Sequence, residues 1–248
     1  MQWGTNDKGR MHSKLNKQYR HEYKYYLDAC QSAVLESRCS LLLPRDSHAG
    51  SCGSYQIKSL YFDDWDNSCY YENEDGVDER SKFRIRYYNQ NLEYISLEKK
   101  SKKRGMTQKQ SCRITREMCE ELMHGNMPEI TADMPDVMQQ LLTQLRLRRL
   151  MPRVIVLYER YPYIYSAGNV RVTFDKNIRS SNDIENFLST DISSRSILPV
   201  GQSILEVKWD EILPEFIKNH LMLDSLQWTS FSKYYLCRKI NCQGGILL

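Results

Sequence analysis

Lysine and arginine recur at every second position in one short segment of the 248-residue chain, a spacing suited to binding phosphate. The segment is 80–88, and its other parity carries mostly apolar side chains. Arginine binds phosphate oxygens through two parallel N–H donors, and lysine binds them as a point charge. The cations that share one parity are Arg80, Lys82, Arg84 and Arg86. Because alternate residues of a β-strand point to opposite faces, the segment predicts a strand with one cationic face.

Carboxylates alternate with lysines on three other segments. The pairs are Glu22 with Lys24, Glu98 with Lys100, and Glu206 with Lys208. Mg²⁺ and Mn²⁺ prefer oxygen ligands and are held by one or two carboxylates together with substrate phosphates. The mixture of carboxylates and cations therefore indicates a site for a polyanion and a divalent metal. Arg160 and Arg171 add cations on two later segments.

Two orientations of these charged faces are open. The commoner arrangement leaves the polar face of an antiparallel sheet in solvent. Here the opposite faces are rich in Tyr, Phe, Ile, Val and Trp, and helical segments are available to cover them. If the helices pack on the outside, the charged faces point inward, where crowded cations need an anionic occupant to offset repulsion and desolvation. An elongated polyanion meets that requirement.

Eight short segments have the alternating pattern that would position these side chains. They are 19–27, 55–63, 80–88, 92–102, 107–114, 153–161, 169–176 and 204–209. This number of strands is typical of a barrel or a sandwich. We predict an α+β fold in which a closed antiparallel eight-stranded β-barrel carries helices packed on its outside.

Helical patterns interrupt and follow the strands. They cover 28–43, 115–124, 135–150, 213–223 and 232–240. Asp28 and Ser232 suit N-cap positions, and Gly125 suits the position just after a helix. The first 17 residues are polar and lack periodicity, so 1–17 is predicted to be a disordered lead-in. No repeat or long linker divides the remainder, and 18–248 is predicted to form a single domain.

The composition argues against several classes of protein. Eight cysteines show no CxxC pair and no zinc-type spacing with histidine, so we expect reduced thiols. No stretch approaches the roughly 18 apolar residues that a membrane span requires, and the first residues lack the apolar core of a signal peptide. We therefore expect no transmembrane segment and a cytoplasmic location. The five histidines show no pairing that would support a histidine general base.

The order of these motifs resembles a known family. The matching segments are RHEYKYYL at 20–27, SLYFD at 59–63, KFRIRYY at 82–88, SLEKK at 96–100, YERYPY at 158–163, NVRVTFD at 169–175, ILEVKW at 204–209 and FSKYYL at 231–236, together with Lys109. They resemble the polyphosphate polymerase domain of the vacuolar transporter chaperone (VTC) family, within the triphosphate tunnel metalloenzyme superfamily. The superfamily's first strand carries Glu-x-Glu-x-Lys, whereas this chain has Arg20, Glu22 and Lys24. The departure removes one metal ligand and looks like the more basic polymerase branch, which argues against a simple triphosphatase or adenylate cyclase.

The resemblance implies roles for individual residues. It assigns catalysis to Lys233, Arg84, Arg86 and Lys100, substrate binding to Lys24, Lys109, Tyr158, Arg160, Arg171, Lys208 and Ser232, and a metal, Mn²⁺ or Mg²⁺, to Glu206 with Glu22 or Glu98 as helpers. Lys233 also lies beside the predicted N-cap of the last helix, and a helix N-terminus attracts phosphate independently of any family.

The activity implied is transfer of the ATP γ-phosphoryl group to a growing inorganic polyphosphate chain, with ATP and polyphosphate as partners. Two alternatives stay open: a catalytically silent module that binds polyphosphate or nucleotide, and an inorganic triphosphatase. Nucleic-acid binding is disfavoured because stacking would require tyrosines on the cationic parity, where segment 80–88 has only Tyr88. Coupling to translocation would need a separate membrane partner.

Overall fold

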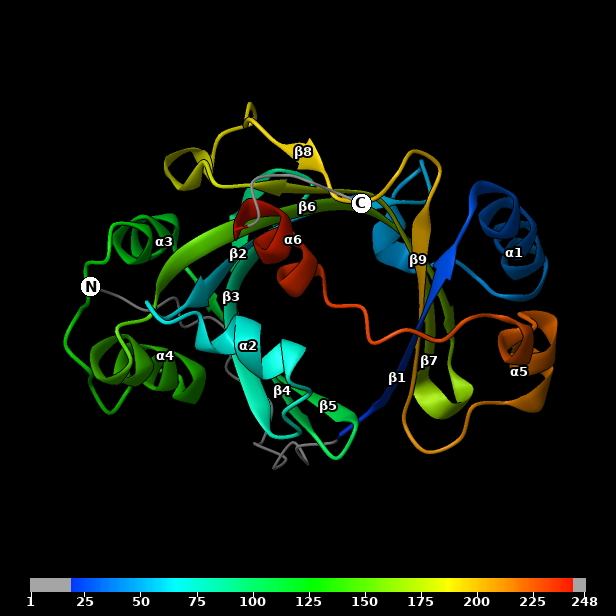
Figure 1. Cartoon of the computed structure of the whole chain (residues 1–248), viewed down its shortest axis with the longest axis horizontal. Coiled ribbons are helices and arrows are strands. Elements are labelled where there is room, and N and C mark those ends of the chain that lie inside the picture. Colours follow the sequence, from blue (N-terminus) through cyan, green and yellow to red (C-terminus); the bar gives the residue numbers. More distant parts are fainter. Residues whose placement is uncertain (1–18, 243–248) are drawn as a thin grey trace, which may run out of the picture.

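One antiparallel sheet of nine strands dominates the protein, whose structure is a computed structural model that describes residues 19–242 (Figure 1). The strands are β1 (His21–Leu27), β2 (Tyr55–Asp63), β3 (Arg80–Tyr88), β4 (Asn91–Lys103), β5 (Met106–Ile114), β6 (Met151–Tyr165), β7 (Val170–Ser181), β8 (Arg195–Ser196) and β9 (Ser203–Trp209). Eight of them follow the order β1-β9-β7-β6-β2-β3-β4-β5, and β8 pairs with β7. The eight predicted strands are all present, whereas the short β8 was not predicted. The predicted lead-in, 1–17, lies outside the described residues.

The prediction of a closed barrel is wrong, because the sheet is an open, curled half-barrel. Within residues 19–242 its two edge strands, β1 and β5, form no ladder and are joined by an isolated bridge between Arg20 and Thr107, with backbone hydrogen bonds of 2.9 and 3.0 Å. Farther along β1, the segment around Thr229 pairs with the free edge of the strand. The Thr229 N–H donates to the Lys24 carbonyl at 2.9 Å, and Trp228 forms an isolated bridge with Tyr25. Since this segment occupies the backbone groups that a β1–β5 ladder would need, the barrel does not close there.

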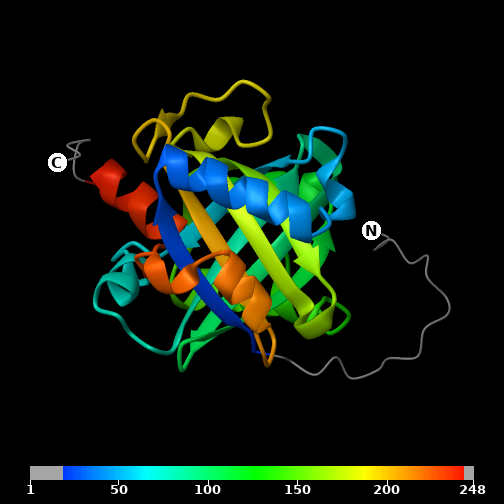
Figure 2. The same cartoon turned by 90° about the vertical axis from the view of Figure 1, so that its right-hand side faces the viewer.

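Six α-helices and four short 3₁₀ turns surround the sheet. They are α1 (Ala29–Leu42), α2 (Ser68–Glu74), α3 (Arg116–Met123), α4 (Asp136–Leu147), α5 (Glu215–His220), α6 (Lys233–Cys242), η1 (Ser47–Ala49), η2 (Ala167–Asn169), η3 (Ile184–Asn186) and η4 (Leu223–Ser225). Helices α3 and α4 pack on β4, and α1 packs on β1 and β9 (Figures 1 and 2). Helix α6 lies against β6, β7 and α2. Five of the six helices were predicted, and α2 was missed.

The predicted helix caps are present. The Asp28 carboxylate accepts from the Gln31 N–H at 2.8 Å, and the Gln31 side chain accepts from the Asp28 N–H at 3.0 Å. The Ser232 hydroxyl accepts from the Tyr235 N–H at 3.3 Å. Gly125 follows α3 with φ +78°, a conformation that glycine adopts without strain.

The apolar parity of the strands faces outward beneath the helices, as predicted. Phe83, Ile85 and Tyr87 of β3 are buried in one cluster with the apolar residues of α3 and α4. Leu205 and Val207 of β9 are buried in another with residues of α1 and α5. The charged parity is thereby directed to the concave face of the sheet. Between residues 19 and 242, no helix has the length and apolar character needed to cross a bilayer, and the seven cysteines whose side chains are described are free thiols.

Candidate functional site

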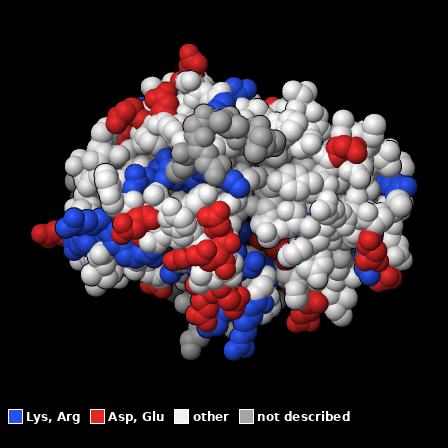
Figure 3. Space-filling view, viewed as in Figure 1, with Lys and Arg blue, Asp and Glu red and all other residues white. Residues whose placement is uncertain are grey.

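A cavity of about 470 Å³ lies on the concave face of the sheet, and the predicted site residues converge on it. Those that line it are Glu22, Lys24, Arg84, Arg86, Lys100, Lys109, Tyr158, Arg160, Arg171, Glu206, Lys208, Ser232 and Lys233. Glu98 lies behind this lining and is 1% exposed. On the face shown in Figure 3, Asp and Glu gather beside Lys and Arg at the lower centre, over α2 and the β4 and β5 strands of Figure 1.

Three cations surround Glu98 on one side of the cavity. The Arg84 Nε and Nη2 atoms lie 2.7 and 2.6 Å from its Oε2 atom, and the Lys109 Nζ atom lies 3.1 Å from Oε1. Arg86 Nη1 is 3.8 Å away. Burial raises the pKa of Glu98, but the three cations outweigh it and hold that pKa well below its usual range. We call Glu98, Arg84, Arg86 and Lys109 the β3–β5 cluster.

Hydroxyl groups from neighbouring strands fix the two arginines. Arg84 donates to the Tyr61 hydroxyl at 2.8 Å, and Arg86 donates to the Ser59 hydroxyl at 2.9 Å and to the Tyr158 hydroxyl at 3.2 Å. Sequence reasoning missed Ser59 and Tyr61 as site residues. They share one parity of β2, so the alternation that identified the cationic strand could have indicated them.

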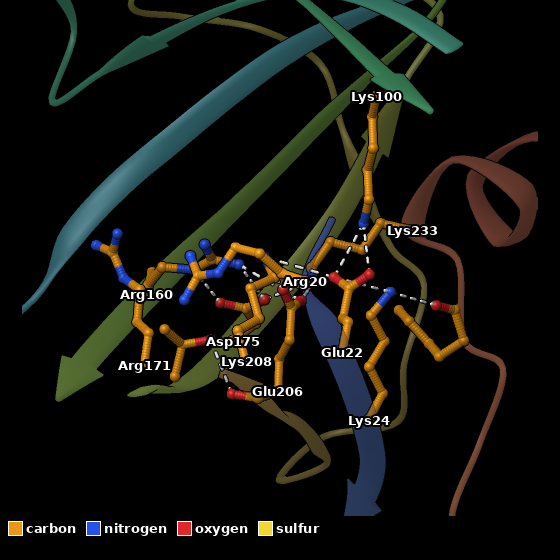
Figure 4. Close-up of polar contacts among 12 residues, drawn as sticks. Arg20, Glu22, Lys24, Lys100, Arg160, Arg171, Asp175, Glu206, Lys208 and Lys233 are labelled. Carbon is orange, nitrogen blue, oxygen red and sulfur yellow. Dashed lines mark hydrogen bonds and ion pairs between the residues drawn. The ribbon is translucent and has the colours of Figure 1, made fainter. Parts of the chain in front are cut away.

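Three carboxylates and five cations alternate on the other side of the cavity (Figure 4). The members of this β1–β9 cluster are Glu22, Asp175, Glu206, Lys24, Lys100, Arg160, Lys208 and Lys233. Lys100 donates to both oxygens of Glu22 at 2.7 and 2.9 Å. Lys208 Nζ lies 3.4 Å from Glu22 and also contacts Glu206. Two carboxylates thus meet at one ammonium.

Charge and burial compete at the ion pair of Glu22 and Lys100. Burial raises the pKa of Glu22, but Lys100, Lys24 and Lys208 outweigh it and bring that pKa to about 2. Burial also disfavours the charged form of Lys100, and its neighbours Lys24 and Lys208 add repulsion, so its pKa falls to about 7 despite the contact with Glu22. The neighbouring cations thus lower the pKa values of both partners, and they keep the Glu22 carboxylate in its ionised form.

Asp175 organises the far end of the β1–β9 cluster and was missed by sequence reasoning. Its fully buried carboxylate accepts two hydrogen bonds from Arg160, at 2.7 and 2.8 Å, and lies 2.5 Å from Lys233 Nζ. Arg160 and Lys233 each lie 3.8 Å from the same oxygen of Glu206. Burial raises the pKa of Asp175, but Arg160 and Lys233 outweigh it and lower that pKa. Asp175 lies on the same parity of β7 as Arg171, and this alternation could have indicated it as a site residue.

Arg171 and Lys24 connect the charged lining to neighbouring segments of the chain. Arg171 contacts Asp46, the residue before η1, and donates to the hydroxyl of Tyr55 on β2 at 2.9 Å, so both hold its guanidinium. Lys24 Nζ lies 3.7 Å from Glu22 and donates to the Phe231 carbonyl at 3.0 Å, which ties β1 to the segment before α6.

The comparisons with known proteins agree with this architecture. A family model described as VTC domain matches residues 19–241. A protein of Hippeastrum, described as a proposed adenylyl cyclase with a dominant triphosphatase activity, is similar in structure with a TM-score of 0.51 and 13% identity, covering 93% of this chain and 97% of its own. A proposed adenylate cyclase of Bacillus halodurans has a TM-score of 0.49 and 12% identity, covering 86% of this chain and 95% of its own. At 13% identity the likeness to the Hippeastrum protein is one of fold. No curated protein matches the sequence.

Proposed function

Because the chain belongs to the VTC domain family, we propose that it is an ATP-dependent polyphosphate polymerase that works in the cavity of its half-barrel. One observation carries the proposal. The cavity brings cations from both of its charged clusters together with Lys233 of α6, whose ammonium lies between Asp175 and Glu206. Such a surface complements a chain of phosphates, and the nearby carboxylates supply oxygen ligands for a metal.

In the proposed reaction the bond between the γ-phosphorus of ATP and its bridging oxygen breaks, and the electron pair leaves with ADP. A terminal oxygen of the polyphosphate chain forms the new bond to that phosphorus. Phosphoryl transfer needs alignment and charge neutralisation more than a covalent nucleophile. Arg84 and Arg86 would hold phosphate oxygens in a fixed orientation, because hydroxyl groups already fix both guanidinium groups. Lys233 would stabilise charge on the transferred group.

A divalent metal is part of the proposal, and two of the three predicted ligands fit it. Among residues 19–242 no group of three or more His, Cys, Asp and Glu side chains could hold a metal ion. Magnesium, however, takes only one or two protein carboxylates when phosphates and water supply the rest. Glu22 and Glu206, which meet at Lys208, would hold the ion, and it would neutralise charge on the phosphate oxygens. Glu98 stays a prediction as a ligand, because its ion-pair partners, Arg84, Arg86 and Lys109, are not shared with Glu22 or Glu206.

The test is incubation of the purified protein with ATP and Mn²⁺, with ADP and polyphosphate measured together. Equal production of ADP and of polymerised phosphate is the expected result. Release of inorganic phosphate without polymer would instead identify a triphosphatase. If neither ADP nor phosphate forms while tripolyphosphate still binds, the protein is a silent binding module, and the polymerase proposal is wrong.

A further inference from the structure

A buried carboxylate that belongs to neither charged cluster joins the end of β2 to helices α2 and α6. Asp63 is fully buried, and its Oδ1 atom accepts from the N–H groups of Asp64 and Cys69, each at 2.9 Å. Its Oδ2 atom accepts from the Tyr70 N–H at 3.3 Å and from the Tyr234 hydroxyl. Four donors from three chain segments thus meet at one carboxylate.

Tyr234 is the second residue of α6 and follows Lys233 directly. It is 2% exposed, and its ring contacts the Tyr61 ring with a centroid distance of 5.3 Å. Lys82 Nζ lies 4.5 Å from the centroid of the Tyr234 ring. The Tyr234 ring therefore contacts Tyr61, whose hydroxyl accepts a hydrogen bond from Arg84, and the Tyr234 hydroxyl is bound by Asp63.

The position of Tyr234 matters because α6 supplies Lys233 from the edge of the cavity. Helix α6 begins at Lys233, immediately after the extended segment 228–232 that crosses the edge of β1. The first turn of a helix is held by few intrahelical hydrogen bonds, so side-chain contacts largely determine its position. A buried hydrogen bond to an ionised carboxylate is a strong contact of this kind.

We propose that the hydrogen bond between Tyr234 and Asp63 is a positioning contact that holds the first turn of α6 so that Lys233 reaches Asp175 and Glu206. The inference rests on the proposed function, because it assigns Lys233 a role in turnover. Asp63 lies outside the cavity lining, and Tyr234 lines the cavity but its hydroxyl is bonded to Asp63, so both act through Lys233. Loss of the contact should misplace the Lys233 ammonium, while the cations on β3 and β5 still bind the substrate phosphates.

The test compares Tyr234→Phe with Tyr235→Phe. Both substitutions remove one hydroxyl group from the same turn, and both keep the ring. The Tyr235 hydroxyl donates to Glu74 at 3.1 Å at the exposed side of the helix, and its ring stacks on Tyr70, away from the cavity. We expect Tyr234→Phe to lower kcat at least about tenfold with KM for ATP changed less than twofold, and Tyr235→Phe to leave both near wild type.

Two further measurements separate positioning from loss of fold. Calorimetry with tripolyphosphate should give the same number of binding sites per chain in both variants, and kcat is expressed per binding site. Amide hydrogen exchange in 233–242 should be faster in Tyr234→Phe than in Tyr235→Phe. If Tyr234→Phe yields too little folded protein, Asp63→Asn provides the second variant, with the same loss of kcat expected.

The outcomes distinguish the two proposals. Wild-type protein that binds tripolyphosphate but makes no ADP would refute the polymerase and would leave the anchor to be judged by hydrogen exchange alone. Equal kcat in the two tyrosine variants would overturn the positioning role in an active enzyme. Unchanged exchange in α6 of Tyr234→Phe would overturn the anchor itself.

Discussion

The two charged clusters face one cavity and carry the same excess of two cations over carboxylates, yet they are built differently. In the β3–β5 cluster two arginines and one lysine enclose a single carboxylate. In the β1–β9 cluster four lysines and one arginine are interleaved with three carboxylates. Arginine keeps its proton and binds in a fixed planar geometry, whereas lysine is mobile and its pKa shifts readily on burial.

Net charge does not distinguish the two sides of the cavity, whereas the arrangement of carboxylates does. The β3–β5 cluster presents cations whose orientation is already set, which suits ground-state binding of phosphates. The β1–β9 cluster holds ion pairs that share partners, so a phosphate or a metal can replace one partner without leaving the other buried and alone. We therefore place binding mainly on β3–β5 and turnover mainly on β1–β9.

The largest effect that this division predicts is on turnover. Lys233→Ala and Glu206→Ala should each abolish measurable production of ADP and polyphosphate, because both residues lie in the β1–β9 cluster. Binding of tripolyphosphate should persist, since the β3–β5 cluster is intact. Turnover by single-cycle kinetics and affinity by calorimetry provide the two measurements. Wild-type turnover in either variant would refute the division.

Asp175→Asn should produce the next largest effect, this time on stability. The substitution removes the charge that Arg160 and Lys233 share in a fully buried position. Leaving buried charges without their partner typically costs about 3 to 5 kcal/mol. Urea unfolding should show that loss in the free energy of unfolding, and Asn186→Ala, an exposed polar site on η3, serves as a control within about 0.5 kcal/mol of wild type. A loss below about 1 kcal/mol would show that the two cations find other partners.

The pH dependence of stability should also reflect the β1–β9 cluster. The pKa of Glu22 in the folded protein is about 2, below its ordinary value of 4.5, so its stabilising effect is complete above pH 4.5 and is lost as pH falls towards 2. A pKa difference of this size corresponds to about 3 kcal/mol. Unfolding curves between pH 5 and pH 2 should therefore fall less steeply for Glu22→Gln than for wild type. Parallel curves would contradict the role of Lys100 and Lys24 in holding the carboxylate ionised.

The sequence predicted the parts of the molecule that depend on local alternation. Charged residues alternate with apolar residues along each strand, so they share one face. This alternation was enough to predict that Arg84, Lys100 and Glu206 line one cavity, without knowledge of the strand order. The caps at Asp28 and Ser232 are local signals of the same kind.

The features that the sequence did not predict depend on contacts between segments that are far apart in the chain. Closure of the barrel depends on whether β5 or the segment around Thr229 pairs with the edge of β1, and both candidates lie far from β1 along the chain. Asp175 and Asp63 each stand at the end of a motif, and their importance comes from partners on α6. Helix α2 begins after Asn67, at φ +57°, and takes its first N–H partners from Asp63 and Asp64, which no helical periodicity indicates.

The smallest predicted effects concern single cations of the β3–β5 cluster. The order of their effects on affinity tests whether the orientation or only the charge of these cations binds phosphate. Arg86 is 5% exposed and is held by Ser59 and Tyr158, so Arg86→Ala should weaken tripolyphosphate binding by about 1 to 3 kcal/mol. The Lys109 side chain is 54% exposed, and solvent screens its charge, so Lys109→Ala should cost less than about 1 kcal/mol. Both affinities are measured by calorimetry at one ionic strength, with kcat at saturating ATP as the second readout. If the orientation of the cations determines phosphate binding, Arg86→Ala weakens the affinity more than Lys109→Ala does, and neither substitution abolishes turnover. Equal losses of affinity would mean that charge alone accounts for binding by this cluster.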